Sequence, residues 1–272
     1  MLIDLTLMAV LMTNPDAGQG GHVGIAYLTA EGKKLGAACL KGDGASCIQL
    51  GDDLIQREGF RGKALGAYEK ACSVNAWRGC SKLGFRLIEV SREKSVVGRA
   101  LTLFQRACDR GDALGCSNLA TAYSDGEGVL KDKAKAAELF GKACTAGDMI
   151  ACAILGSLVT QGDGMAADPT RGFELNQRAC TGGAMLGCVN SGVSLLQGVN
   201  GKKDASTAAA LFDRACKQEP CVDVSCSSAC LQLGRLTVRG QGVKADAARG
   251  KELLIRACTA GLEGACAEAG QK

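Results

Sequence analysis

The sequence has few aromatic residues, a single histidine and no long apolar run. Phe, Trp and Tyr make up 4% of the 272 residues, whereas 38 residues are glycine. One large core usually needs bulky side chains, so this composition favours helices that pack closely through small residues. No stretch approaches the length of apolar sequence that spans a bilayer, and we therefore expect no membrane span.

The charge pattern excludes another class of function. The net charge is +4, acidic and basic residues are interspersed, and no basic run occurs. Nucleic acid is therefore not expected as a partner. The one histidine, His22, lies in a Gly-rich entry segment and would not serve convincingly in a Ser-His-Asp triad.

Cysteine is abundant and recurs at a fixed interval. The sixteen cysteines include pairs whose members lie eight positions apart, and the first member recurs mostly every 36 residues. Such self-similarity indicates a repeat protein. The first cysteines are Cys39, Cys72, Cys108, Cys144, Cys180, Cys216 and Cys258, and the second cysteines are Cys47, Cys80, Cys116, Cys152, Cys188 and Cys266.

One repeat carries an insertion. Cys216 has no cysteine eight positions later, and Cys230 follows it by fourteen. Six extra residues account for that gap and for the 42-residue step to Cys258. We interpret Cys230 as the displaced second cysteine, and Cys221 and Cys226 as additions that came with the insertion.

Each repeat predicts two helices, here called helix A and helix B. Helix B ends near the first cysteine and carries apolar or aromatic residues four and five positions before it, as in "AAELFGKAC". Helix A follows the second cysteine, and a small residue, usually glycine, recurs four positions after that cysteine. Glycine within a helix costs about 1 kcal/mol relative to alanine, so its recurrence suggests that another helix approaches closely.

The loops between helices A and B share a Gly-x-Gly motif, as in "SDGEGVLKD" and "VRGQGVKAD". Glycine suits left-handed turns, and the aspartate can cap the next helix. Helix, glycine-rich loop, helix and tight turn at this period predict an all-α fold, an α/α superhelix (solenoid) of about 36-residue helix-turn-helix repeats.

This pattern resembles the Sel1-like repeat, a relative of the tetratricopeptide repeat. Its motifs, in chain order, are L-G, G-x-G-V, D, A, F, A-C, G and A-C. The cysteine pairs resemble the bacterial Hcp (Helicobacter cysteine-rich) family and a related mitochondrial cytochrome c oxidase assembly factor. The resemblance covers residues 21–272, about six to seven repeats with the last one truncated. Residues 1–20 are predicted to be a separate N-terminal tail.

Three interpretations of the cysteines remain open: disulfides, zinc sites and free buried thiols. Paired cysteines on a repeat lattice favour disulfides, because zinc needs four ligands and usually mixes Cys with His. Zinc has more weight only at the local cluster in the insertion, and overall we expect neither a metal nor a cofactor. The predicted bridges are Cys39–Cys47, Cys72–Cys80, Cys108–Cys116, Cys144–Cys152, Cys180–Cys188 and Cys258–Cys266, with Cys216–Cys230 around Cys221–Cys226.

Disulfides persist where thiols are not continually reduced, which predicts a periplasmic or secreted protein, or one of the intermembrane space if eukaryotic. The start "MLIDLTLMAVLM" is only a partial export signal, because Asp4 interrupts it and no basic residue precedes it. It is either the remnant of such a signal or an ordinary first helix.

Enzymatic chemistry has little support in the sequence. Similarity to the Hcp family implies a β-lactam-binding protein or a weak β-lactamase-like hydrolase. One Ser-x-x-Lys motif occurs, Ser91 to Lys94, but neither Ser-Asp-Asn nor Lys-Thr-Gly accompanies it. We therefore name no catalytic residue, and enzymatic activity stays an alternative to binding.

The favoured function is binding of a protein or extended peptide by a monomer, on the helix A face. Positions two, five and nine after each second cysteine share the helix A face opposite its core positions. Helix A commonly lines the concave side of such solenoids, where side-chain amides could bind a peptide backbone and cations could select an acidic ligand. The predicted binding residues are Lys82, Asn118, Asn190, Gln232 and Arg235.

Overall fold

The computed structural model describes residues 29–199, 201–221 and 223–270, which form fourteen α-helices and no strand. The predicted tail, 1–20, and His22 lie outside the described residues. No described helix is both long and apolar enough to cross a membrane. The helices are α2 (Ala30–Leu40), α3 (Gly44–Ile55), α4 (Arg61–Ser73), α5 (Trp77–Val90), α6 (Lys94–Asp109), α7 (Ala113–Asp125), α8 (Lys133–Thr145), α9 (Met149–Gln161), α10 (Pro169–Thr181), α11 (Met185–Gln197), α12 (Ala205–Cys216), α13 (Val224–Arg239), α14 (Ala247–Thr259) and α15 (Glu263–Glu268).

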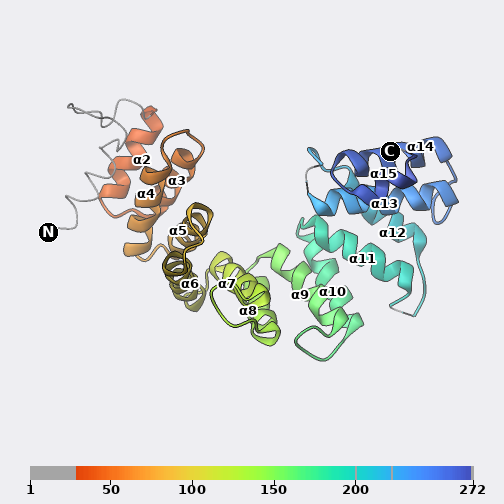
Figure 1. The fold of residues 1–272 in the computed structure, drawn as a ribbon, viewed down its shortest axis with the longest axis horizontal. Helices are drawn as coiled ribbons and strands as arrows, with labels where there is room; N and C mark the ends of the chain where they lie inside the picture. The colour runs from red at the N-terminus through yellow and green to blue at the C-terminus, as the bar shows by residue number, and fades with distance from the viewer. Residues whose placement is uncertain (1–28, 200, 222, 271–272) are drawn as a thin grey trace. The chain divides into compact units, whose positions relative to one another are not determined.

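The chain forms two compact units, one ending at Asp132 and one beginning at Lys133 (Figure 1). In the first unit, each helix from α2 to α7 packs against the next, and α3, α5 and α7 also contact one another in sequence. In the second, α8 to α15 pack consecutively, and α9, α11 and α13 again form a row. Odd-numbered helices are thus helix A, even-numbered helices are helix B, and the predicted all-α repeat fold is confirmed.

Aspartates begin many of the helices, as the loop sequences predict. Asp112 and Asp148 cap helices A, and their carboxylates accept hydrogen bonds from first-turn backbone amides. Asp168, Asp204 and Asp246 do the same for helices B. These caps satisfy amides that would otherwise lack a partner, so several repeats carry their own helix start signals, whereas α5 and α6 begin without a side-chain cap.

The helix A glycines face a bulky side chain of helix B. A Cβ on Gly51 would lie 2.4 Å from the Tyr68 ring, and one on Gly192 would lie 2.6 Å from the Phe212 ring. The sequence suggested a close helix backbone at this position. The nearest group is instead the side chain four residues before the helix B cysteine. It is an aromatic ring at Tyr68, Phe104 and Phe212, where the glycine and the ring form one packing unit, and Asn176 or Leu254 in two other repeats.

The second glycine of each Gly-x-Gly loop lies against the preceding repeat. A Cβ on Gly164 would lie 2.5 Å from the backbone of Lys133, and one on Gly242 would lie 2.3 Å from the backbone of Ala205. Both glycines also have positive φ, 82° and 72°. Only glycine combines a favourable positive φ with the absence of a Cβ that would clash with this backbone, which explains the recurrence of the motif.

The structure contains eight disulfides in the pairing that the spacing predicts, and no described cysteine is free. Seven of them join the end of a helix B to the first turns of the next helix A. In Cys144–Cys152, for example, the Cα atoms lie 4.6 Å apart. Each such bridge therefore connects consecutive repeats and locks the tight turn between them.

Candidate functional site

All five predicted binding residues lie on helices A. Lys82 and Asn118 belong to α5 and α7 of the first unit. Asn190, Gln232 and Arg235 belong to α11 and α13 of the second. Their surroundings differ, and the difference decides which of them can meet a ligand.

Lys82 is engaged within the protein. Its Nζ donates to Asp52 Oδ1 at 2.7 Å, and the same oxygen accepts a hydrogen bond from the Tyr68 hydroxyl at 2.7 Å. Burial, and then the hydrogen bond to Asp52, raises the pKa of Tyr68 above its usual range. Lys82 thus neutralises the Asp52 carboxylate, which also accepts a hydrogen bond from the buried Tyr68.

Asn190 is also engaged within the protein. Its Nδ2 donates to Ser157 Oγ at 2.9 Å and to Asn176 Oδ1 at 3.1 Å. Asn176 is 1% exposed and occupies the helix B position where four other repeats have Phe or Tyr. The Asn190 amide therefore satisfies a buried polar side chain, and its nitrogen has no further proton for a ligand.

These contacts follow one rule. Counted from the helix A cysteine, the side chain at position five of one helix A bonds to position two of the next. Arg235 and Glu268 repeat the arrangement, with Arg235 Nε donating to Glu268 Oε2 at 2.9 Å. We call these two-five contacts. They are Asp52 with Lys82, Ser157 with Asn190, and Arg235 with Glu268.

Asn118 and Gln232 fall outside this rule, because position five of the preceding helix A is apolar. That position holds Phe85 before Asn118 and Val193 before Gln232. Asn118 Nδ2 is buried and has no hydrogen-bond partner among the described residues. Gln232 is half-buried instead and lines a groove.

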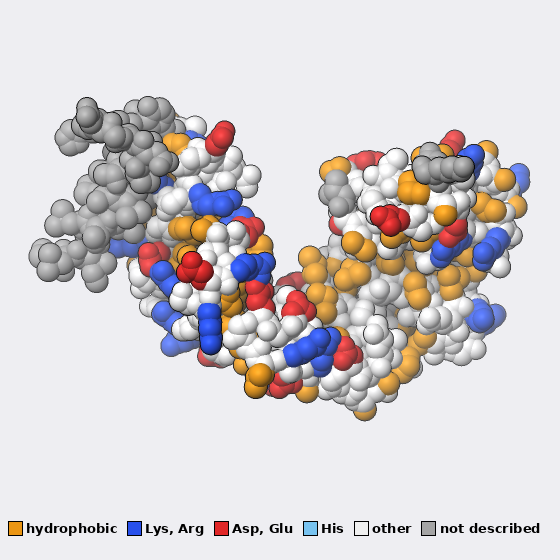
Figure 2. Space-filling model, in the orientation of Figure 1, with side chains coloured by type: hydrophobic (Ala, Val, Ile, Leu, Met, Phe, Trp, Pro, Cys, Tyr) orange, Lys and Arg blue, Asp and Glu red, His pale blue; other side chains and the backbone are white. Residues whose placement is uncertain are grey.

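The groove lies in the second unit, has a volume of about 820 Å³ and includes two of the five predicted residues, Gln232 and Arg235. Figure 2 shows acidic and basic side chains together beside α12 and α13, with hydrophobic side chains over α11. The groove thus combines apolar contacts with charge and amide groups, as ligand sites do. It is lined by Leu196, Lys203, Ala205, Gln232, Arg235, Leu236, Arg239, Gln241 and Glu268.

The charge of the groove is positive. Three cations, Lys203, Arg235 and Arg239, face one carboxylate, Glu268. Arg235 is neutralised by Glu268, and their hydrogen bonds raise the pKa of Arg235 and lower the pKa of Glu268. Lys203 and Arg239 make no side-chain hydrogen bond or ion pair within the described part of the chain. The charge of Arg239 also helps to lower the pKa of Glu268, so Lys203 and Arg239 are the groove cations without a hydrogen-bonded or ion-paired carboxylate among the described residues.

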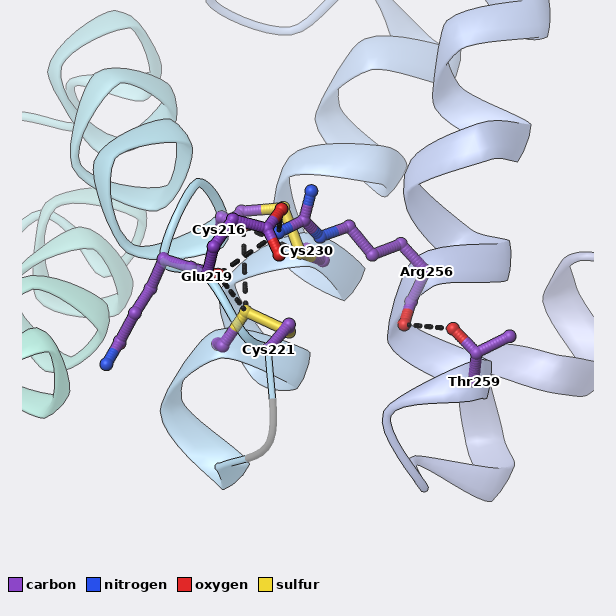
Figure 3. Close-up of polar contacts among 8 residues, drawn as sticks. Cys216, Glu219, Cys221, Cys230, Arg256 and Thr259 are labelled. Carbon is purple, nitrogen blue, oxygen red and sulfur yellow. Dashed lines mark hydrogen bonds and ion pairs between the residues drawn. A yellow bond between two sulfur atoms is a disulfide. The ribbon is translucent and has the colours of Figure 1, made fainter.

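The insertion holds the cluster for which zinc was an alternative. The sulfur atoms of Cys221, Cys226 and Cys230 lie within 4.8 Å of one another. Figure 3 shows the Cys221 bridge beneath the Cys216–Cys230 bridge. All four sulfurs are bonded in pairs, so in this form the cluster offers no thiolate to a metal.

The Ser-x-x-Lys motif does not sit on one helix. Ser91 follows the end of α5, and its Oγ accepts a hydrogen bond from the Glu93 amide at 3.1 Å. Lys94 begins α6 and is exposed. The one-turn helical spacing that would place a lysine beside a nucleophilic serine is therefore missing.

The repeats match a known family. The model of the Sel1 repeat family matches residues 82–112, 113–148, 150–183, 185–220 and 227–262, which together exceed half of the chain. The chain belongs to the Sel1 repeat family. Each family-matched Sel1 repeat contains one helix A and the following helix B, so several of the bridges join one Sel1 repeat to the next.

Solved structures with the same fold include other Sel1 repeat proteins. The protective antigen c5321 of uropathogenic Escherichia coli has a TM-score of 0.70 at 19% identity over 89% of this chain. The match covers 51% of that antigen, so this chain spans about half its length. A Sel1 repeat protein from Oxalobacter formigenes has a TM-score of 0.68 at 18% identity, over 82% of this chain and 86% of that one. At these identities the likeness establishes the fold alone.

A cysteine-rich relative is also similar. Helicobacter pylori cysteine rich protein B is 28% identical over 51% of this chain and 95% of its own, with a TM-score of 0.38. No curated protein matches the sequence.

Several residues of these sites were not among the predicted binding residues, including Lys203, Arg239, Gln241, Glu268 and Asn176. Lys203 lies in a loop, so counting positions along helix A could not find it. Glu268 holds position two of the last helix A, and counting the face one repeat further would have included it. Asn176 was signalled by the break in the Phe or Tyr pattern of helix B.

Proposed function

We propose that this Sel1 repeat protein is a binding scaffold, not an enzyme, and that it acts as a monomer on an extended, acidic segment of a partner protein. The observation that supports this most is the groove on α13, where neither Lys203 nor Arg239 makes a side-chain hydrogen bond or ion pair with another described residue. Sel1 repeats typically mediate protein interactions, which fits the same function.

The groove offers a place for each part of such a segment. Lys203 and Arg239 would meet its carboxylates. The amides of Gln232 and Gln241 can donate to and accept from a peptide backbone. Leu196 and Leu236 supply apolar contact between them.

The compartment follows from the bridges. Eight disulfides indicate an oxidising, non-cytoplasmic location. We propose the periplasm or the extracellular space, or the mitochondrial intermembrane space in a eukaryote. A rigid, bridged framework would present the groove without the entropy loss of ordering it on binding.

Fluorescence polarisation with short labelled peptides tests the groove. One peptide contains Asp and Glu, and its counterpart has Asn and Gln at the same positions. Replacing Lys203→Gln and Arg239→Gln together should weaken binding of the acidic peptide about tenfold, because charge-assisted hydrogen bonds contribute roughly 1.5 kcal/mol or more. The neutral peptide should bind weakly to both proteins.

A matched control separates groove contacts from general charge. Arg171→Gln and Lys251→Gln together remove the same charge from exposed positions of α10 and α14 that do not line the groove. This variant should keep the original affinity. Equal losses in both double variants, or a preference for the neutral peptide, would overturn the proposal.

A further inference from the structure

The insertion adds a bridge that the repeat lattice does not need. Cys216–Cys230 already joins α12 to α13, as the other lattice bridges join their helices. Cys221–Cys226 lies inside the loop that this bridge closes, and its cysteines are five positions apart. Opening the inner pair would therefore leave the turn between α12 and α13 locked.

Cys221 has an unusual position among the cysteines. It lies in the connection between α12 and α13, whereas the other fifteen cysteines lie within helices. Its side chain is half-buried, and its partner Cys226 is fully buried at 0% exposure. An incoming thiolate therefore has access to one sulfur of this bridge and not to the other, and access is a main determinant of exchange rates.

The inserted segment is held in place beside this bridge. Arg256 of α14 donates from Nη2 to the Gln218 carbonyl oxygen at 3.1 Å and to Glu219 Oε1 at 2.6 Å (Figure 3). The cation thus pairs with the nearby acid and anchors the backbone that leads to Cys221. The bridge is presented at a fixed place on the second unit.

We propose that Cys221–Cys226 is a thiol-exchange site that accepts an alkyl thiolate at Cys221. The thiolate attacks Cys221 Sγ, a new S–S bond joins it to Cys221, and the Cys221–Cys226 bond breaks with its electron pair leaving on Cys226 Sγ. One S–S bond forms and one breaks, so no external oxidant or reductant is needed. The reverse attack by Cys226 releases the thiol and restores the bridge.

Cys226 is placed to be the leaving group. It lies in the first turn of α13, where the positive end of the helix stabilises a thiolate. The Asp223 carboxylate accepts the Cys226 backbone N–H at 2.7 Å and opposes this effect in part. After protonation, the thiol would have the carbonyl oxygens of Cys216 and Gln218 within reach, at 3.6 and 3.8 Å from its sulfur.

One other bridge has accessible sulfur atoms. Cys258 and Cys266 are both half-buried. Each lies within a helix, however, and their bridge is the one disulfide that joins α14 to α15. It is therefore the competitor against which selectivity must be measured.

Mapping the first modified cysteines tests the proposal. The native, oxidised protein is incubated with limiting reduced glutathione, trapped with iodoacetamide at successive times, and digested without reduction for mass spectrometry. Glutathione should appear on Cys221 and the alkyl group on Cys226, at an extent at least about tenfold above any other pair. The proposal would be overturned if Cys258–Cys266 reacted before Cys221–Cys226. It would also be overturned if glutathione were found on Cys226 and the alkyl group on Cys221.

A second arm replaces glutathione with an unstructured peptide that carries one cysteine. Modification of Cys221 by both probes is expected and assigns the site to protein and small thiols alike. Reaction with glutathione alone would restrict it to small thiols, and reaction with neither would overturn the proposal.

Two double variants distinguish exchange at Cys221–Cys226 from a loss of reactivity caused by a change in the fold. Cys221→Ser with Cys226→Ser should keep the helical signal of the native protein and lose the early glutathione-reactive phase. Cys258→Ser with Cys266→Ser should retain that phase. Loss of the phase in the second variant and its survival in the first would contradict the assignment, and the mapping of the native protein holds even where a variant fails to fold.

Discussion

At the scale of single residues, the helix A face is largely occupied by its own contacts. Asp52 with Lys82 and Ser157 with Asn190 are hydrogen-bonded between consecutive helices A. A polar side chain on this face is available to a ligand mainly where its neighbour at position five is apolar, as Val193 is for Gln232. The side chain at position five of the preceding helix A, more than the residue type itself, therefore decides which polar residues can bind a ligand.

The glycine and ring unit gives a sharp test of packing. Gly84→Ala should destabilise the protein by roughly 1–3 kcal/mol, because the new Cβ would lie 2.7 Å from the Phe104 ring and 3.1 Å from the Ala100 carbonyl oxygen. Chemical denaturation followed by circular dichroism measures the change.

Gly98→Ala is the matched control on the neighbouring helix. Nothing lies within 4 Å of a Cβ at Gly98, so alanine should stabilise α6 by up to about 1 kcal/mol. Similar destabilisation by both substitutions would mean that helix A and helix B do not pack through this unit.

At the scale of elements, the turn from helix B to helix A is the most heavily fixed part of the repeat. At α8 and α9, Cys144–Cys152 closes the turn. Asp148 caps α9 by accepting the amides of Ile150 and Ala151 at 3.0 Å. Covalent closure and capping act on the same few residues, so this turn should resist opening more than the Gly-x-Gly loops.

Removing one lattice bridge measures its contribution. Cys144→Ala with Cys152→Ala should lower the free energy of unfolding by about 2.5 kcal/mol or more, since the bridge closes a loop of nine residues in the unfolded chain. The same assay on the Cys221→Ser, Cys226→Ser protein should show a smaller loss, because that bridge closes a shorter loop within Cys216–Cys230. Equal stability of the Ala variant and the native protein would contradict a stabilising role of the lattice.

Much of this architecture could be predicted from the sequence, because the helix period, the glycines, the aspartate caps and the cysteine spacing repeat together. Contacts between repeats were harder to predict. The counting of faces placed Asn190 among solvent-facing residues, but its partners Ser157 and Asn176 come from two other helices. The groove also needs a loop residue, Lys203, that no helical periodicity describes.

At the scale of the whole molecule, disulfides supplement a core with few aromatic side chains. The buried residues are mainly Ala, Cys, Leu and a few rings such as Phe104 and Phe212. Small side chains allow close helix packing but bury less apolar area each. A bridge between nearly every pair of consecutive repeats restrains the unfolded chain instead, so stability should depend on an oxidising environment.

The most direct test of this account is a disulfide map of the protein exported to an oxidising compartment and alkylated before purification. Mass spectrometry of a non-reducing digest should find all sixteen cysteines bonded, seven pairs joining consecutive helices B and A, and Cys221–Cys226 nested within Cys216–Cys230. Mostly alkylated cysteines, or bridges between distant repeats, would contradict the account.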